Sequence, residues 1–371
     1  AVSAANDEMA LGAVEASSGK NIMVVGFDAT DDALDAIKAG RMAATIAQQP
    51  KLIGATAVQN AIKLMLGEKI EQNIPVEVTL ISTDNVDTYQ QEEPEEEVPV
   101  VGNGSIGLSV STQNNPFFVD LADGAKEAAN KLGVTLTIAD AGDDVTKQAS
   151  DIEDLVSKQI SVLIVNPVDS DAITGAVEAA MAKGVRVISV DRAVNGVEID
   201  CQIASDNVAG AEMATMFIVD TLGKGTKTAE LQGTPGASAA IDRGTGFHNI
   251  ADKDLEVVAS QTANFDRTQG MQVMENMLQA HGDIQAVFAA NDEMALGAVE
   301  AASGKNILVV GFDATDDAID AIKSGRMAAT IAQQPKLIGA TAVENAVALI
   351  SGSSIPESVP VEVTLITKDN A

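Results

Sequence analysis

The chain has 371 residues, of which 46% are hydrophobic, so it can bury a substantial core and is long enough for two or three globular units. Its 54 acidic and 23 basic residues give a formal net charge of −31, which argues against nucleic-acid or anionic-membrane binding, because both need clustered Lys and Arg. No apolar run approaches the ~20 residues that span a bilayer, so membrane insertion is not expected.

The first 85 residues are repeated at the other end of the chain. The run AANDEMALG at residues 4–12 recurs at residues 289–297, and the match continues without a gap on both sides. Roughly four positions in five are identical, and the differences concentrate after Asn60, a pattern that favours divergence between natural duplicates over a copied insert. We expect residues 1–86 to be a partial repeat of residues 286–371 that cannot bury a complete core by itself.

An acidic segment separates the first copy from the rest of the chain. Residues 90–99, QQEEPEEEVP, contain two prolines and show no apolar periodicity. Because like charges repel and proline favours extended backbone, residues 87–104 are predicted to form an extended linker.

From Ser105 onward, short β-rich runs alternate with helical stretches. This alternation indicates right-handed βαβ units and a parallel sheet. The first expected strands cover residues 105–110, 134–138, 162–165 and 185–190, with helices after Pro116 and over residues 145–158 and 171–183.

The same alternation continues after Asp206. There are too many strands for one compact sheet, so the sequence predicts an α/β fold with two doubly wound lobes. The later expected strands lie near residues 228–232, 255–260, 286–289 and 308–311, and a further helix covers residues 336–350.

Polar and aromatic side chains follow several of these strands. The run STQNNPFF at residues 111–118 comes directly after the first strand, Asp191 and Arg192 follow the strand at 185–190, and Asp313 follows the strand near 308–311. Open α/β folds bind ligands at the carboxyl ends of their strands. A sugar has a ring of hydroxyl groups between two weakly apolar faces, which suits flat side chains together with polar ones.

These motifs resemble those of the ribose-type periplasmic sugar-binding proteins. STQNNPFF is similar to the first sugar loop of that family, and VDR, ANFDR, NDEMALG and VVGFD match the family in the same order, so that the resemblance covers residues 105–371. It implies the type I periplasmic-binding-protein fold, in which a three-strand hinge joins two doubly wound parallel-sheet lobes. The hinge would lie near residues 204–206, 333–335 and 366–369.

The resemblance also implies a monosaccharide site made of two kinds of side chain. Phe117, Phe118 and Phe265 would cover the faces of the sugar ring. A lone Asp in such a loop is more often a helix cap or an ion-pair partner, but the joint recurrence of the whole pattern favours ligand binding. The residues expected to hold the hydroxyl groups are Ser111, Asn115, Asp191, Arg192, Arg243, Asn291, Asp313 and Gln333.

The expected organisation has four parts, namely the repeat, the linker and two lobes. The N-lobe would comprise residues 105–205 with about 334–365, and the C-lobe residues 206–333 with about 366–371. Each lobe would therefore be built from separate stretches of the chain.

The function that the resemblance implies is reversible binding of ribose or a related monosaccharide by hinge closure. The partners would be an ABC permease or a chemoreceptor, and the location would be periplasmic or extracellular.

An enzyme is not expected, because His248 and His281 lie in predicted helix-end or loop contexts without a nucleophile motif nearby. With a single cysteine and two histidines, neither a disulfide nor a Cys/His metal site is expected, and no cofactor is predicted.

Two alternative functions belong to other classes. One is an extracellular structural filament, built in tandem or by domain swapping from sugar-binding modules. The other is a sugar-responsive repressor, which shares the two-lobed core but needs a basic helix-turn-helix where the acidic linker stands before Ser105.

The N-terminal copy retains the side chains that the resemblance assigns to the ligand. Asn6, Asp28 and Gln48 correspond to Asn291, Asp313 and Gln333. The copy could be the end of a preceding module in an array, complete a module in a neighbouring chain, or replace residues 286–371 within its own chain. Self-association through the copy is expected from the second arrangement.

Overall fold

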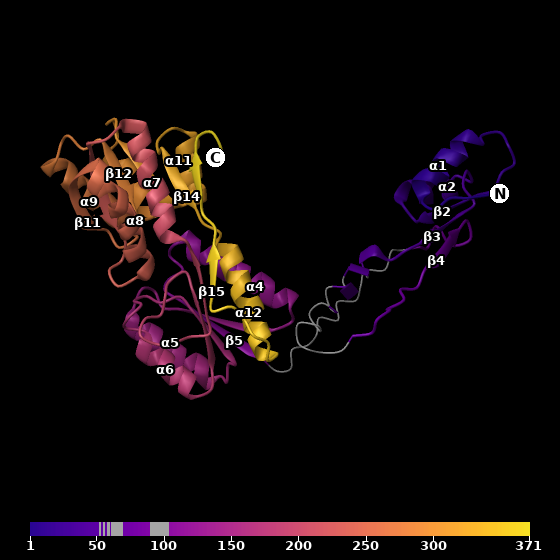
Figure 1. Ribbon diagram of the computed structural model, residues 1–371, viewed down its shortest axis with the longest axis horizontal. Coiled ribbons are helices and arrows are strands. Elements are labelled where there is room, and N and C mark those ends of the chain that lie inside the picture. The colour runs from indigo at the N-terminus through magenta and orange to yellow at the C-terminus, as the bar shows by residue number, and fades with distance from the viewer. Residues whose placement is uncertain (52, 55, 58–59, 61–69, 90–103) are drawn as a thin grey trace. The chain divides into compact units, whose positions relative to one another are not determined.

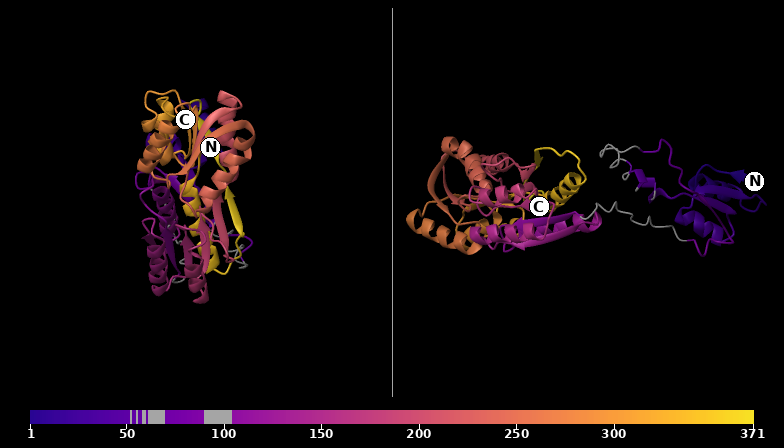
Figure 2. Two further views of the ribbon diagram at one scale, coloured as in Figure 1. Left: turned by 90° about the vertical axis from the view of Figure 1, so that its left-hand side faces the viewer. Right: turned by 90° about the horizontal axis from the view of Figure 1, so that it is seen from below.

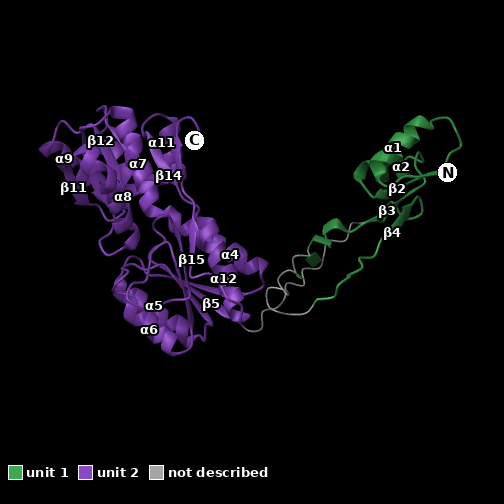
Figure 3. Cartoon of the chain, viewed as in Figure 1, with its two compact units in different colours: residues 1–97 green, residues 98–371 purple. Residues whose placement is uncertain are grey.

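The computed structural model describes residues 1–51, 53–54, 56–57, 60, 70–89 and 104–371. These residues belong to two compact units, which comprise residues 1–97 (unit 1) and 98–371 (unit 2) (Figures 1 and 3). Most of the predicted linker, residues 90–103, lies outside the described residues. No helix among the described residues has the length and apolar character that crossing a membrane requires.

Unit 1 is built around one small sheet with the strand order β1-β2-β3-β4. The first three strands are parallel and β4 is antiparallel to β3. Ala10, Ile37, Met42 and Ile81 are buried in its core. The elements of unit 1 are β1 (Val2–Ser3), α1 (Asp7–Ala16), β2 (Val24–Asp28), α2 (Asp31–Lys38), β3 (Ala44–Ala47) and β4 (Thr79–Ser82).

The first lobe of unit 2 contains a six-stranded parallel sheet in the order β15-β9-β8-β7-β5-β6. All four residues of β7 are buried, as expected for a strand whose sheet is covered on both faces. The elements of this lobe are β5 (Ser105–Val110), α4 (Pro116–Lys131), β6 (Thr135–Asp140), α5 (Val145–Ser157), β7 (Val162–Val165), α6 (Thr174–Ala182), β8 (Arg186–Val190), β9 (Cys201–Ser205), α12 (Pro335–Ile350) and β15 (Ser358–Val361).

The second lobe contains another six-stranded sheet, in the order β11-β10-β12-β13-β14-β16. Only β16, at one edge, is antiparallel to its neighbour. The elements are α7 (Asn207–Leu222), β10 (Thr226–Gln232), α8 (Ser238–Asp254), β11 (Leu255–Thr262), α9 (Arg267–Ala280), β12 (Ala286–Ala289), α10 (Asp292–Ala301), β13 (Leu308–Asp313), α11 (Asp316–Lys323), β14 (Ala329–Ala332) and β16 (Thr364–Thr367). The predicted fold class, two doubly wound lobes, is thus confirmed.

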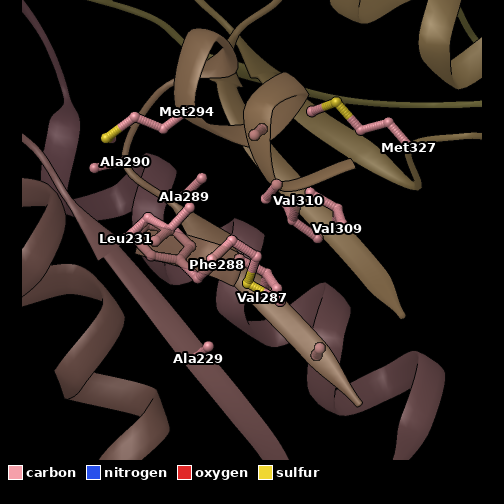
Figure 4. Close-up of a cluster of buried hydrophobic side chains, with 14 of the residues drawn as sticks. Ala229, Leu231, Val287, Phe288, Ala289, Ala290, Met294, Val309, Val310 and Met327 are labelled. Atoms are coloured by element: carbon pink, nitrogen blue, oxygen red, sulfur yellow. The ribbon is translucent and has the colours of Figure 1, made fainter. Parts of the chain in front are cut away.

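The core of the second lobe is centred on the strands that the N-terminal repeat duplicates. Phe288 on β12 is fully buried and stacks on Phe247 of α8 with a centroid separation of 4.8 Å. Figure 4 shows Phe288 among the buried side chains around Leu231 and Val287. In unit 1 the corresponding position is Ser3, which is exposed.

The chain passes between the two lobes of unit 2 three times. Two crossings, between β9 and α7 and between β14 and α12, lie at the predicted positions near residues 204–206 and 333–335. The third lies between β15 and β16, earlier than the predicted segment at 366–369. The reason is that β15 pairs with β9 in one sheet and β16 pairs with β14 in the other. The C-terminal segment, yellow in Figures 1 and 2, therefore contributes to both lobes.

Two glycines allow α4 and α12 to approach closely in the first lobe. A Cβ atom at Gly124 would overlap the backbone of Lys336, and one at Gly339 would overlap the backbone carbonyl of Leu121. The start of α4 is fixed by Asn115, whose side-chain oxygen accepts a 2.9 Å hydrogen bond from the N–H of Phe117, while Pro116 occupies the first helical turn. This packing holds the loop after β5 at the inner edge of the lobe.

Candidate functional site

A pocket in unit 2 is lined by residues that follow strands of both lobes. Its walls come from the start of α4, the loop after β8, helix α8, the loop after β11, the last residue of β13, and the segments that follow β12 and β14. The lining residues are Asn115, Phe117, Phe118, Asp191, Arg192, Ala239, Arg243, Phe265, Asn291, Asp313 and Gln333. All the residues proposed in the sequence for the ligand are therefore together here except Ser111.

Ser111 does not line this pocket. It directly follows β5, is fully buried, and its backbone N–H donates to Oδ1 of Asn166 over 3.1 Å. Its hydroxyl has no hydrogen-bond partner among the described residues. Asn115 and Phe117, at the start of α4, do line the pocket.

Aromatic rings form the apolar walls of the pocket, and guanidinium groups lie against these rings. Phe117 and Phe118 lie edge to face with centroids 5.2 Å apart. The guanidinium of Arg192 lies 5.2 Å from the ring centre of Phe118 and 5.6 Å from that of Phe265. Such cation–π contacts hold the charged groups in fixed planes, so that their N–H donors are oriented before any ligand arrives.

Asp191 and Arg192 form the polar part of the wall in the first lobe. Asp191 accepts a 3.2 Å hydrogen bond from Nδ2 of Asn166 through Oδ2, which is 3.7 Å from Nε of Arg192. Arg192 donates from Nη1 to the carbonyl of Pro167 over 2.9 Å. Burial raises the pKa of Asp191, and the charge of Arg192 opposes that rise. Burial likewise lowers the pKa of Arg192, with Asp191 opposing.

Arg243 and Asp313 form the polar part of the wall in the second lobe. Arg243 donates from Nε to Oδ1 of Asn207 over 2.9 Å and from Nη1 to the carbonyl of Ala290 over 2.7 Å, and its guanidinium lies 3.9 Å from the ring centre of Phe312. Its Nη1 is 3.6 Å from Oδ1 of Asp313. Three groups of the second lobe therefore fix the guanidinium of Arg243: the side chain of Asn207, the carbonyl of Ala290 and the ring of Phe312.

Asp313 is joined to Gln333, whose Nε2 donates to Oδ1 over 2.6 Å. Burial raises the pKa of Asp313 to about 7, although Arg243 and the hydrogen bond from Gln333 oppose the rise. The backbone at Asp313 has a φ of 124°, and Asp28 in unit 1 has a φ of 117°. Such angles are unfavourable for residues other than glycine, so both copies retain a strained turn at this strand end.

Three buried polar atoms of the pocket have no hydrogen-bond partner among the described residues. They are Oδ1 of Asp191, Nε of Arg192 and Oε1 of Gln333. Leaving such atoms unpaired costs about 1–3 kcal/mol each. Two are acceptors and one is a donor, which is the combination that hydroxyl groups satisfy, because each hydroxyl both donates and accepts.

Sequence reasoning missed the residues that hold these side chains in place. Asn166 follows β7 directly and connects Ser111 to Asp191, while Asn207 at the start of α7 binds Arg243. The position of Asn166 at the carboxyl end of a fully buried strand was the available signal.

The expected position of His248, at a helix end or in a loop, is wrong. His248 lies inside α8, where its Nδ1 is 2.7 Å from Oδ1 of Asp252 and its Nε2 is 3.3 Å from Oε2 of Glu230.

The corresponding residues of unit 1 keep their local contacts in a more open setting. Gln48 donates from Nε2 to Oδ1 of Asp28 over 2.5 Å, and Asn6 caps α1 by accepting from the N–H of Met9 over 2.9 Å. All three are half-buried, whereas their counterparts in unit 2 are buried. The repeat has no counterparts of Arg192, Arg243 or Phe265, which precede residue 286.

A family model described as periplasmic binding protein domain matches residues 1–69 and 106–354. Among curated proteins, the ribose import binding protein of Bacillus subtilis is 54% identical over 266 residues, which cover 71% of this chain and 87% of that protein. The ribose import binding protein of Escherichia coli is 46% identical over 268 residues, covering 71% and 90%. The Caulobacter myo-inositol binding protein has a similar structure, with a TM-score of 0.69, 34% sequence identity, and coverage of 72% of this chain and 94% of that one.

Proposed function

The chain belongs to the periplasmic binding protein family, and from this premise we propose that residues 105–371 bind ribose or a closely related monosaccharide reversibly. Two relatives that are 54% and 46% identical are named ribose import binding proteins. The observation that carries the proposal is the set of unpaired buried atoms on Asp191, Arg192 and Gln333 between aromatic walls. Ribose supplies hydroxyl groups for those atoms and an apolar ring face for the phenylalanines.

Each group in the pocket has a defined role in this proposal. The carboxylate of Asp191 accepts from sugar hydroxyls and the guanidinium of Arg192 donates to them, both in charge-assisted hydrogen bonds. Asp313 and Gln333 offer acceptor oxygens from the other lobe, while Phe117, Phe118 and Phe265 exclude water from the ring faces. Neither lobe alone contains the full set, so the sugar binds best when both lobes contact it.

Closure of the two lobes around the sugar follows from this division of contacts. A ligand that touches both lobes has a higher affinity for the closed form and shifts the population towards it. The three crossings between β9 and α7, β14 and α12, and β15 and β16 are the segments that absorb the motion. We therefore assign residues 105–205 and about 334–362 to one lobe and residues 206–333 and about 363–371 to the other.

Titration calorimetry with ribose and a panel of other monosaccharides tests this function. We expect ribose to bind with a dissociation constant well below roughly 1 mM, the weak end of specific affinity, and more tightly than hexoses. Variant Arg192→Met, which keeps the apolar stem, should lose most of the affinity without loss of the fold. Absence of binding by every sugar of the panel would contradict the proposal.

The proposed role is delivery of the sugar to an ABC permease or a chemoreceptor in the periplasm or outside the cell, without chemical change to the sugar. This rests on the names of the relatives, which are import binding proteins. NMR of the sugar after long incubation with the protein should show the unchanged compound.

We further propose that residues 1–86 are a partial duplicate of the last third of the binding module. The support is the sequence repeat together with the same strand order and the same Asn, Asp and Gln positions. The alternative of a structural filament, and self-association by domain swapping, find no support in the comparisons, and we do not retain them.

A further inference from the structure

Two loops of the first lobe of unit 2 contact the start of helix α8 in the second lobe. They are the loop after β7, which contains Ser170, and the loop after β8, which contains Ala193. The N–H of Ser170 donates to the carbonyl of Gly236 over 2.9 Å. The N–H of Ser238 donates to Oγ of Ser170 over 3.2 Å, and the N–H of Ala193 donates to Oγ of Ser238 over 2.8 Å. Three protein–protein hydrogen bonds therefore join the two lobes.

The lobes also approach each other closely at this contact. Gly236 has a φ of 85°, and a Cβ atom there would overlap Oδ2 of Asp169 in the opposite lobe. The adjacent Ser170 is fully buried. Glycine is therefore needed at position 236 both for the turn and for the approach of the first lobe.

Helix α8 has no side-chain cap of its own at this end. Its N-cap residue is Ala237, and alanine is among the poorest residues at that position. The first N–H groups of a helix have no partner within the helix. Oγ of Ser170, in the other lobe, accepts from one of them, the N–H of Ser238. The first lobe thus supplies a cap to the helix that carries Arg243 into the pocket.

The loop that carries Ser170 is held by bonds within the first lobe. Oδ1 of Asp169 accepts from the N–H groups of Asp171 and Ala172 over 2.9 and 2.8 Å. The carbonyl of Ser170 accepts from the N–H of Asn195 over 2.9 Å. These bonds do not involve the second lobe, so the loop can keep its shape when the lobes separate.

The contact lies beside the sugar pocket but outside it. None of the four residues joined by the three interlobe bonds lines the pocket, whereas Arg192 and Ala239, which each adjoin one of them in the chain, do. Bonds between the lobes that need no sugar favour the closed form with or without a ligand.

We propose that Ser170, Ala193, Gly236 and Ser238 form an interlobe latch, which stabilises the closed form of unit 2 and slows release of the sugar. The part concerning release rests on the proposed sugar binding, whereas the latch itself acts without a ligand. Opening the lobes replaces its three hydrogen bonds by bonds to water, so each contributes modestly and the latch remains reversible. The lifetime of the complex then depends on residues that do not touch the sugar.

Distance measurements between two spin labels test the latch without any sugar. The labels are attached through Glu178→Cys on α6 and Glu275→Cys on α9, two exposed positions in different lobes of the full chain, while the native Cys201 is buried. We expect a population at the interlobe distance of the structure. In the double variant Ser170→Ala, Ser238→Ala the ratio of closed to open molecules should fall at least about fivefold, because two hydrogen bonds are lost.

Thr245→Ala is the matched control for this measurement. Its hydroxyl also lies on α8, but it donates to the carbonyl of Ile241 within the same helix over 2.9 Å, so the ratio should not change. Absence of the closed population without sugar, an unchanged ratio in the double variant, or an equal fall in Thr245→Ala would overturn the latch.

The dissociation rate of ribose gives a second measurement. Ser238→Ala removes the acceptor for the N–H of Ala193 and should raise this rate about three- to tenfold. The association rate should not fall, because the latch forms only after the lobes meet. Ribose that binds and dissociates at an unchanged rate would contradict the latch alone. Absence of binding by every sugar would contradict the proposed function, and the spin-label distances would then decide on the latch.

Discussion

Residues 1–86 and 286–371 have nearly the same sequence but different surroundings, and their comparison separates local from tertiary effects. Among the described residues, both copies form the first two helices and a sheet with the same strand order, although residues 73–76, the counterpart of β15, form no strand. In both, an aspartate near the start of the first helix accepts a 2.6 Å hydrogen bond from a threonine, Asp7 from Thr45 and Asp292 from Thr330. Burial differs sharply, since Ile53 is 44% exposed and Ile338 is fully buried. The local sequence determines most of these elements, whereas β15 depends on pairing with β9, and burial depends on what packs against each element.

The largest difference between the copies should appear at Phe288. Variant Phe288→Ser gives unit 2 the residue of unit 1, leaves a cavity against Phe247, and should lower the free energy of unfolding by about 3–5 kcal/mol. The reverse change Ser3→Phe places the ring on an exposed edge and should alter unit 1 by less than about 0.5 kcal/mol. Urea unfolding followed by circular dichroism measures both, and equal effects would contradict the comparison.

The paired glycines should respond in opposite directions. Gly297→Ala forces a methyl group against the backbone of Arg267 and should destabilise unit 2 by about 3 kcal/mol. Gly12→Ala meets no atom and should stabilise α1 by up to about 1 kcal/mol through helix propensity. Hydrogen exchange resolved by peptide can follow each unit separately; faster exchange in unit 1 after Gly12→Ala would refute this expectation.

The paired aspartates test which copy carries the sugar site. Asp313→Asn removes a charged acceptor from the pocket and should weaken ribose binding by about 10- to 100-fold, corresponding to the ~1.5–3 kcal/mol of a charged hydrogen bond. Asp28→Asn, at the same place in unit 1, is the matched control and should leave the affinity of the full chain unchanged. Calorimetry measures both constants, and a comparable loss in the control would assign the site differently.

The smallest expected effect is a dependence of stability on pH. Burial raises the pKa of Asp313 to about 7, above the value of about 3.9 in the unfolded chain, so the folded state binds the proton more tightly. Stability without ligand should therefore fall as the pH rises from about 4 to about 7. From pH 6 to 7 the loss from this group should be about 1 kcal/mol.

Urea unfolding at pH 6 and pH 7 measures that loss. Asp313→Asn removes the titrating group and should reduce the difference in stability between the two pH values. An unchanged difference in Asp313→Asn would show that another group causes the dependence.

Much of the fold and of the pocket could be predicted because the parallel sheet obeys simple rules. Residues that follow buried strands converge at one edge, which brings Asp191 and Asp313 to the same pocket. The third crossing lies a few residues earlier than predicted, in the two residues that separate β15 from β16. Their assignment to different sheets depends on pairing with β9 and β14, distant in sequence.

The supporting residues were harder to predict for a related reason. A single asparagine such as Asn166 or Asn207 is common after strands and at helix starts, and only the folded structure shows which charged side chain it holds. His248 was expected at a helix end or in a loop, yet α8 continues through Gly244 and Gly246 to Asp254. Gly246 is required there because a Cβ atom would overlap the carbonyl of Val208 on α7.

The three crossings between the lobes also restrict the kind of motion that unit 2 can make. One flexible connection would allow the lobes to rotate about any axis, whereas three connections oppose twisting and sliding and leave bending as the easy mode. In the proposed closure, Asp191 and Asp313 would then return to the same relative register each time. The proposed site would therefore discriminate between sugars that differ at one hydroxyl group by a reproducible closed geometry, since the lobes would have little freedom to adjust around a poorly fitting sugar.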